Sequence, residues 1–143
     1  FDGERFETVH FELVARRAEA LAAALAALGV GPGDRVATYS WNHRQHLEAY
    51  LAVPAMGAVL HTLNIRLFAE QVAGIMAHAA DTVLIADASL LGQLAPVLDR
   101  VPTLRHVVVV GESPAHVAGA ARVSGYEELI AGCGGHFDWP VLD

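Results

Sequence analysis

The spacing of apolar residues predicts a long amphipathic helix near the start of the chain, over residues 10–28. Gly29 can adopt the positive φ that ends such a helix, and Pro32 prevents its continuation. The segment is rich in alanine, the residue with the highest helix propensity. Its apolar positions recur at intervals of three and four, the period of one helix face: Val14, Ala18, Leu21, Leu25 and Leu28.

Beyond the turn that follows, short apolar runs alternate with helical patterns. They predict strands at residues 35–40, 58–63, 82–86 and 106–110, with helices between them at 46–56, 69–79 and 90–100. The strands begin about 24 residues apart, a spacing typical of strand–helix–strand units with right-handed crossovers. We therefore predict an α/β fold, a wound parallel βαβ sheet with helices on both faces.

The pattern also divides the chain. Residues 8–111 form the predicted core βαβ region, and residues 112–143 form a loop-rich tail with a short helix at 126–130. A length of 143 residues suits one domain or part of a larger one. Because the chain begins at Phe1 and its first methionine is Met56, we expect it to derive from a longer protein by truncation or processing.

The amino-acid composition excludes several classes of function. The net charge of −7 argues against nucleic acid as a partner. All 9 basic residues are arginine, which excludes a Schiff-base or phosphate-loop lysine within these residues. The longest apolar run, residues 49–60, is shorter than the roughly 18 residues that span a bilayer, so no transmembrane segment is expected. A single cysteine cannot form an internal disulfide, and we expect a cytoplasmic location.

Candidate binding residues follow the predicted strands, because wound sheets bind ligands beyond the carboxyl ends of their strands. Trp41 and Asn42 follow the first strand, and Asn64 and Arg66 follow the second. We select these four as candidate cofactor-binding residues, since an arginine can hold a phosphate or carboxylate bidentately. The structural alternatives are packing of Trp41, capping of the next helix by Asn42, and tethering of a loop by Arg66.

The other polar residues give weaker indications of a functional site. Asp87 ends the third strand, as phosphoacceptor and metal-binding aspartates do, but it lacks a lysine or an acidic neighbour, which favours a cap or turn. His43 and His46 lie three residues apart at a helix start, and a zinc site would need further ligands that no spacing marks. His61, between apolar neighbours, is interpreted as an interior histidine. We therefore predict no catalytic residue and no metal site within these residues.

Residues 8–111 contain a series of different short motifs in a specific order. They are HFEL at 10–13, GVGPGDRVA at 29–37, WN at 41–42, LEAYLAVPAMGAVL at 47–60, HTLNIRL at 61–67, EQ at 70–71, HA at 78–79 and LIAD at 84–87. Together they resemble the adenylate-forming, AMP-binding superfamily, and in particular the N-terminal segment of its medium- and long-chain fatty acyl-CoA synthetases.

The resemblance implies an ATP-dependent fatty acid–CoA ligase. In that reaction a carboxylate attacks the α-phosphate of Mg-ATP to give an acyl-adenylate and pyrophosphate, and CoA then displaces AMP. ATP, Mg²⁺ and CoA are implied for the full-length enzyme, and none is expected to bind this segment alone. The phosphate loop and the adenylation lysine would lie beyond Asp143, so the segment is expected to be a scaffold that is not catalytic by itself. The implied partners are the remainder of the same enzyme chain and a fatty acid substrate, and a homodimer is compatible with the family.

Two alternatives stay open at this point. An aryl- or amino-acid-activating member of the superfamily would share these motifs, because the acid pocket lies outside them. A free-standing flavodoxin-like binding module would share the wound sheet. The sequence departs from the family pattern at one place that concerns CoA binding. Some relatives bind the nucleotide of CoA with arginines after the strand that ends near Asp87, whereas residues 88–91 (ASLL) contain no arginine.

Overall fold

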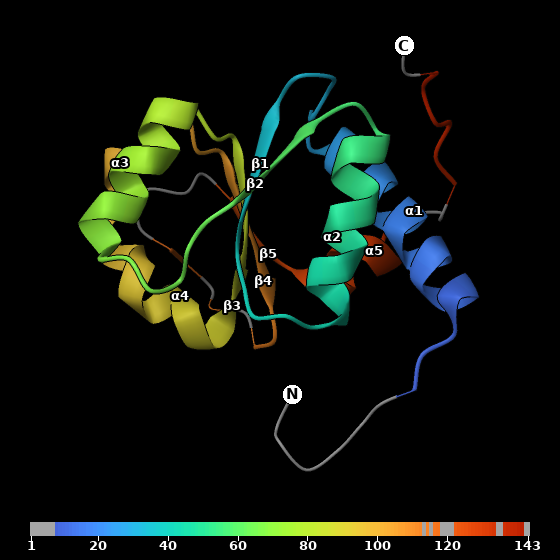
Figure 1. The fold of residues 1–143 in the computed structure, drawn as a ribbon, viewed down its shortest axis with the longest axis horizontal. Helices are drawn as coiled ribbons and strands as arrows, with labels where there is room; N and C mark the ends of the chain where they lie inside the picture. The colour runs from blue at the N-terminus through green and yellow to red at the C-terminus, as the bar shows by residue number, and fades with distance from the viewer. Residues whose placement is uncertain (1–7, 113, 115, 118–121, 134–135, 142–143) are drawn as a thin grey trace.

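A computed structural model of the chain describes residues 8–112, 114, 116–117, 122–133 and 136–141. Its centre is a five-stranded sheet in the order β2-β1-β3-β4-β5, and every pair of neighbouring strands is parallel. The strands are β1 (Arg35–Tyr39), β2 (Val59–Thr62), β3 (Val83–Asp87), β4 (His106–Val110) and β5 (Arg122–Gly125). The predicted wound parallel α/β fold is confirmed (Figure 1).

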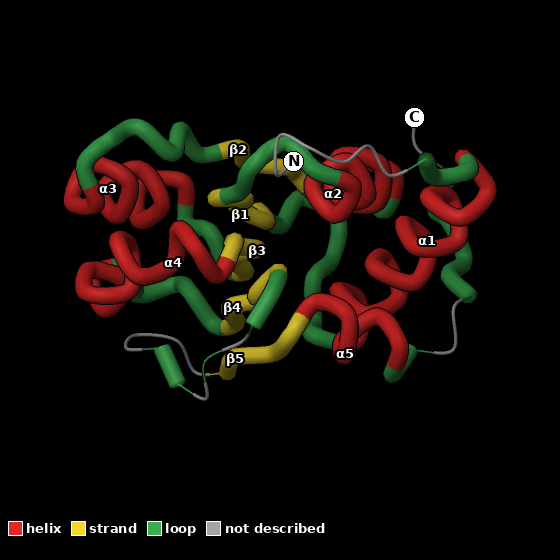
Figure 2. Tube along the Cα trace, turned by 90° about the horizontal axis from the view of Figure 1, so that it is seen from below, coloured by secondary structure: helices red, strands yellow, loops and turns green. Residues whose placement is uncertain are grey.

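Helices cover both faces of this sheet (Figure 2). One face carries α1 (Phe11–Ala27), α2 (Arg44–Ala55) and α5 (Tyr126–Ala131). The other carries α3 (Ala69–Ala79), α4 (Ala88–Leu94) and the 3₁₀ helix η1 (Ala95–Arg100). The chain moves in one direction from β1 to β2 and in the opposite direction from β2 to β3. Right-handed crossovers therefore place α2 and α3 on opposite faces.

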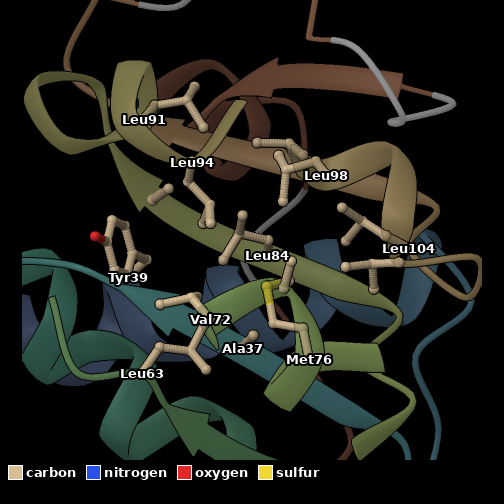
Figure 3. Close-up of a cluster of buried hydrophobic side chains, with 14 of the residues drawn as sticks. Ala37, Tyr39, Leu63, Val72, Met76, Leu84, Leu91, Leu94, Leu98 and Leu104 are labelled. Carbon is tan, nitrogen blue, oxygen red and sulfur yellow. The ribbon is translucent and has the colours of Figure 1, made fainter. Parts of the chain in front are cut away.

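Two hydrophobic cores result, one on each side of the sheet. Alternate strand residues supply them, because successive side chains of a strand point to opposite faces. Ala37, Tyr39 and Leu84 pack with α3 and α4, and Figure 3 shows Met76 beside Leu84 within this core. Val36 and Ile85 pack with α1 and α2. All five residues of β3 are buried, as expected for the central strand of a parallel sheet.

The ends of two helices show how local sequence sets the fold. After α1, Gly29 has a φ of 86°, as predicted from its position in the sequence. After α3, Ala80 takes the same left-handed role with a φ of 57°. Alanine has a Cβ that crowds the following carbonyl in this conformation, at a cost of about 1 kcal/mol.

Three local predictions differ from the structure. The second helix begins at Arg44 rather than residue 46, because the His43 side chain caps it. The helix predicted at 90–100 is two elements, α4 and η1, which join where Pro96 cannot donate a backbone hydrogen bond. β5 was not predicted at all; it extends the sheet into the segment interpreted as loop-rich. Among the described residues, no helix is both long and apolar enough to cross a membrane.

Candidate functional site

The strand order places a topological switch point between β1 and β3. From β1 the chain crosses to β2 on one side, and it then returns to β3 on the other side of β1. Open α/β sheets of this 2-1-3-4-5 order bind ligands in the crevice beyond the carboxyl ends of the strands at that point. A hollow of about 680 Å³ lies there, lined by Trp41, Asn42, His43 and Asp87.

A second cavity, of about 330 Å³, lies between the loops that follow β1 and β2. Its lining includes Ser40, Trp41, Asn42, His46, Leu63, Asn64, Ile65 and Arg66. The structure thus brings together all four candidate residues selected from the sequence. The Trp41 indole is about half exposed, at 51%, and the Asn42, Asn64 and Arg66 side chains are exposed. Aromatic, amide and guanidinium groups of this kind suit a nucleotide, which offers a planar base and phosphates.

Asp87 is the centre of the hydrogen-bonding network at this edge. Its Oδ2 accepts from the Ser40 hydroxyl at 2.8 Å, from the Trp41 backbone N–H at 2.8 Å and from His43 Nε2 at 3.0 Å. Although Asp87 precedes α4, its side chain makes no capping bond to that helix. The interpretation of Asp87 as a cap is therefore wrong. Its carboxylate instead fixes the segment that follows the neighbouring strand.

The two histidines of this region have different roles. His43 Nδ1 accepts from the His46 backbone N–H at 3.2 Å and so caps α2. The alternative that Asn42 caps this helix is wrong, because His43 is the capping residue. The His46 ring bridges Thr38 Oγ1 at 3.0 Å and the Trp41 carbonyl at 3.2 Å, beneath the loop. Burial lowers the pKa of His46, so its ring is neutral at pH 7.

The β2–α3 loop is shaped by hydrogen bonds among its own residues. Asn64 Oδ1 accepts from the Arg66 N–H at 3.0 Å, and the Leu67 N–H donates to the Asn64 carbonyl at 3.2 Å. These bonds form a tight turn that projects Arg66 outward. The structural alternative for Arg66 was that it ties this loop to a neighbouring helix. Within the described part of the chain, no ion pair joins the Arg66 guanidinium to a helix. The described residues also contain no group of three or more His, Cys, Asp or Glu side chains placed to hold a metal ion.

A second polar cluster lies on the face covered by α1, α2 and α5. Glu48 of α2 is fully buried and accepts from Arg17 Nε and from the Tyr126 hydroxyl, both at 2.7 Å. Arg17 also forms a bidentate pair with Glu127, at 2.8 Å for each bond. Burial and the neighbouring Glu48 charge raise the pKa of Tyr126, so its hydroxyl stays protonated and donates. Sequence patterns gave no sign of this cluster, which we call the Glu48 cluster.

His61 is paired rather than simply enclosed. Its Nδ1 lies 2.9 Å from Asp81 Oδ2, and the Asp81 side chain is fully buried. Burial raises the pKa of Asp81, and the bond to His61 partly opposes that shift. The pair joins β2 to the loop before β3. Neither residue lines either of the two cavities, so we assign the pair a structural role.

The geometry defines a wound α/β domain with polar and aromatic loops at its switch point, the class of fold that binds nucleotides there. The family described as "AMP-binding enzyme" matches residues 3–128, most of the chain. The chain belongs to this family of adenylate-forming enzymes, as its motifs suggested.

Relatives and solved structures agree with this assignment. The chain is 40% identical over 140 residues to the 3-methylmercaptopropionyl-CoA ligase of Ruegeria pomeroyi, covering 96% of this chain and 26% of that protein. It is 50% identical over 110 residues to the long-chain-fatty-acid–CoA ligase of Thermus thermophilus, covering 77% and 20%. Coronafacic acid ligase from Pectobacterium brasiliense shares the fold, with a TM-score of 0.85 at 18% identity over 95% of this chain and 27% of that one. The chain spans about a quarter of the length of the curated relatives it matches.

Proposed function

We propose that this chain is the N-terminal sheet region of an ATP-dependent fatty acid–CoA ligase, and that the carboxyl edge of its sheet forms one wall of the active-site cleft. The observation that carries the proposal is the 50% identity over 110 residues to a long-chain-fatty-acid–CoA ligase. A medium-chain-fatty-acid–CoA ligase of Ectopseudomonas oleovorans, 37% identical over 130 residues, supports the same acid class.

The reaction proceeds in two steps. A fatty carboxylate attacks the α-phosphate of Mg-ATP and forms an acyl-adenylate with release of pyrophosphate. The CoA thiolate then attacks the acyl carbon, forms the thioester and releases AMP. We assign no catalytic residue to this chain, because the lysine that the family resemblance implies for adenylyl transfer is not among its residues. Its contribution is to shape and hold the cleft.

Within that cleft we assign Trp41, Asn42, Asn64 and Arg66 to cofactor binding. They line one cavity, and the guanidinium of Arg66 is exposed at its rim. CoA supplies phosphates for a guanidinium and an adenine ring for an aromatic surface. We assign no Mg²⁺ ligand to the chain.

The acid class is tested on the complete enzyme that contains this sequence. Pyrophosphate exchange is measured with alkanoic acids from acetate to palmitate, and with benzoates and amino acids in parallel. We expect exchange with medium- or long-chain alkanoates. Exchange with benzoates or amino acids alone would indicate an aryl- or amino-acid-activating relative, and no exchange with any acid would refute the proposal.

The cofactor assignment is tested by Arg66→Gln in the same enzyme, with Arg100→Gln as its control. Arg100 is also an exposed arginine, but it lies on η1, outside the cavity. Loss of a charged hydrogen bond to phosphate should raise the KM for CoA about tenfold. The control should leave the KM for CoA unchanged. Equal values for the two variants would remove Arg66 from the cofactor surface.

A further inference from the structure

We propose that Asp87 and His43 are positioning residues, which hold the Trp41–Asn42 segment in place as part of the cofactor surface. The consequence for ligand binding rests on the proposed function. The positioning itself rests on the contacts at the β1/β3 switch point. Neither Asp87 nor His43 is among the four candidate cofactor-binding residues.

Asp87 holds the segment by accepting several hydrogen bonds from one short stretch of the chain, from two side chains and one backbone N–H. Its carboxylate receives hydrogen bonds from Ser40, Trp41 and His43, three residues within four consecutive positions. Asp87 belongs to β3, whereas these donors follow β1, the adjacent strand. The carboxylate therefore links the ends of the two strands that border the crevice. Hydrogen bonds to an ionised acceptor are stronger than neutral ones, which makes this link more rigid than an ordinary loop contact.

His43 extends the link to helix α2. Its Nδ1 accepts from the His46 N–H, so the proton of the neutral ring must be on Nε2. That Nε2–H is directed at Asp87, 3.0 Å from Oδ2 and 3.1 Å from Oδ1. One imidazole thus caps α2 and donates to β3 at the same time. The start of the helix is fixed to the end of the strand.

Trp41 is held at both its backbone and its ring. Asp87 accepts its backbone N–H, and the indole Nε1–H donates to Ser89 Oγ on α4 at 3.2 Å. About half of the side chain is nevertheless exposed. Asn42 lies between the anchored residues Trp41 and His43, and both Trp41 and Asn42 line the two cavities. An aromatic surface held in this way loses little conformational freedom when it binds a ligand.

The positioning is tested by hydrogen exchange, followed by mass spectrometry, on the complete enzyme. Asp87→Ala should make the backbone amides of peptides covering residues 40–43 exchange at least about tenfold faster, because Trp41 loses its acceptor. Asp87→Asn keeps one carbonyl oxygen and should be intermediate. Asp99→Ala is the control, because Asp99 is exposed on η1. Unchanged exchange at residues 40–43 in both Asp87 variants would overturn the proposal, whereas peptides from β4 report whether a variant is folded.

The effect on the ligand is tested by kinetics and a double-mutant cycle. Asp87→Ala should raise the KM for CoA about tenfold while kcat changes less than about twofold, as expected when a binding group is displaced. In a Trp41→Ala background the same substitution should have a clearly smaller effect, because Trp41 is one of the two residues through which Asp87 acts on the ligand. Full additivity of the two substitutions would overturn the positioning role. A wild-type enzyme without acid-dependent turnover would refute the proposed function instead, and the exchange experiment would still decide the positioning.

Discussion

The carboxyl edge of the sheet and the face covered by α1, α2 and α5 each contain a carboxylate that gathers partners from distant parts of the chain. Glu48 is bonded to Arg17 and Tyr126, and Arg44 Nε lies 3.4 Å from it. Asp87 is bonded to a hydroxyl, a backbone amide and a neutral imidazole, with no arginine among these donors. The negative charge of Glu48 is balanced by positively charged arginines. The negative charge of Asp87 is stabilised by hydrogen bonds alone.

This difference separates two uses of a buried acid. The Glu48 cluster joins three helices on one side of the sheet, and none of its residues lines either candidate cavity. Asp87 fixes a loop at the edge where ligands bind in such sheets. We infer that the first carboxylate mainly stabilises the fold, and that the second mainly maintains the shape of the site. Substitutions should therefore affect stability and binding in different proportions.

Glu48→Ala should give the largest loss of stability, about 3 kcal/mol, because it leaves a partly buried Arg17 and a buried Tyr126 hydroxyl without their common acceptor. Urea unfolding followed by circular dichroism measures the loss. Glu128→Ala, an exposed glutamate on α5, is the control and should change stability by less than about 0.5 kcal/mol. Equal losses for the two variants would show that the cluster does not stabilise the fold.

Asp87→Ala should destabilise the fold by only about 1–2 kcal/mol, because its donors are neutral and lie near the surface, where water can replace the carboxylate. The same unfolding measurement applies. The comparison of the two carboxylates would fail if Asp87→Ala cost more stability than Glu48→Ala.

Tyr126→Phe should cost about 1 kcal/mol, the value of one hydrogen bond. Glu48 keeps Arg17 in this variant, so its charge stays compensated. In a Glu48→Ala background the same substitution should cost nothing more, since the acceptor is already absent. If Tyr126→Phe still cost about 1 kcal/mol of stability in that background, the tyrosine would act through packing rather than through Glu48.

The smallest effect concerns pH. The pKa of His46 is lowered in the folded state, whereas in the unfolded chain this histidine has its ordinary pKa of about 6.5. As the pH falls below about 6.5, His46 therefore takes up a proton in the unfolded chain before it does so in the folded one. Stability from this group is therefore complete above that value and is lost as pH falls toward the folded pKa. His46→Gln should flatten this part of the pH–stability curve. His10→Gln, at an exposed position before α1, should leave the curve unchanged, and an equal slope in all three proteins would refute the assignment.

The sequence predicted most of the fold because its signals are local. Four parallel strands and the helices between them follow from apolar runs and turn residues such as Gly29. β5 was missed because it is short, and only Val123 among its residues strongly favours a strand. It is a strand because β4 offers a free edge, and that pairing is a non-local contact.

The candidate site was predicted only in outline. The carboxyl ends of the strands identified Trp41 and Arg66, because topology alone brings those loops together. The same reasoning misread Asp87, whose partners lie 44 to 47 positions away in the chain. Which donor a carboxylate meets depends on strand register, and a single sequence without its fold does not specify that register.

The strand order has a consequence for how the domain is made. As the chain leaves the ribosome, β1 comes first, β2 then adds to one side of it and β3 to the other, and β4 and β5 follow outward. None of the five strands that the structure describes has to insert between two that are already paired. Vectorial synthesis can therefore extend the sheet one edge at a time, with each new crossover helix covering a strand soon after it emerges. For a parallel sheet, whose pairings are all slow to form, this order shortens the time in which an apolar strand is left bare.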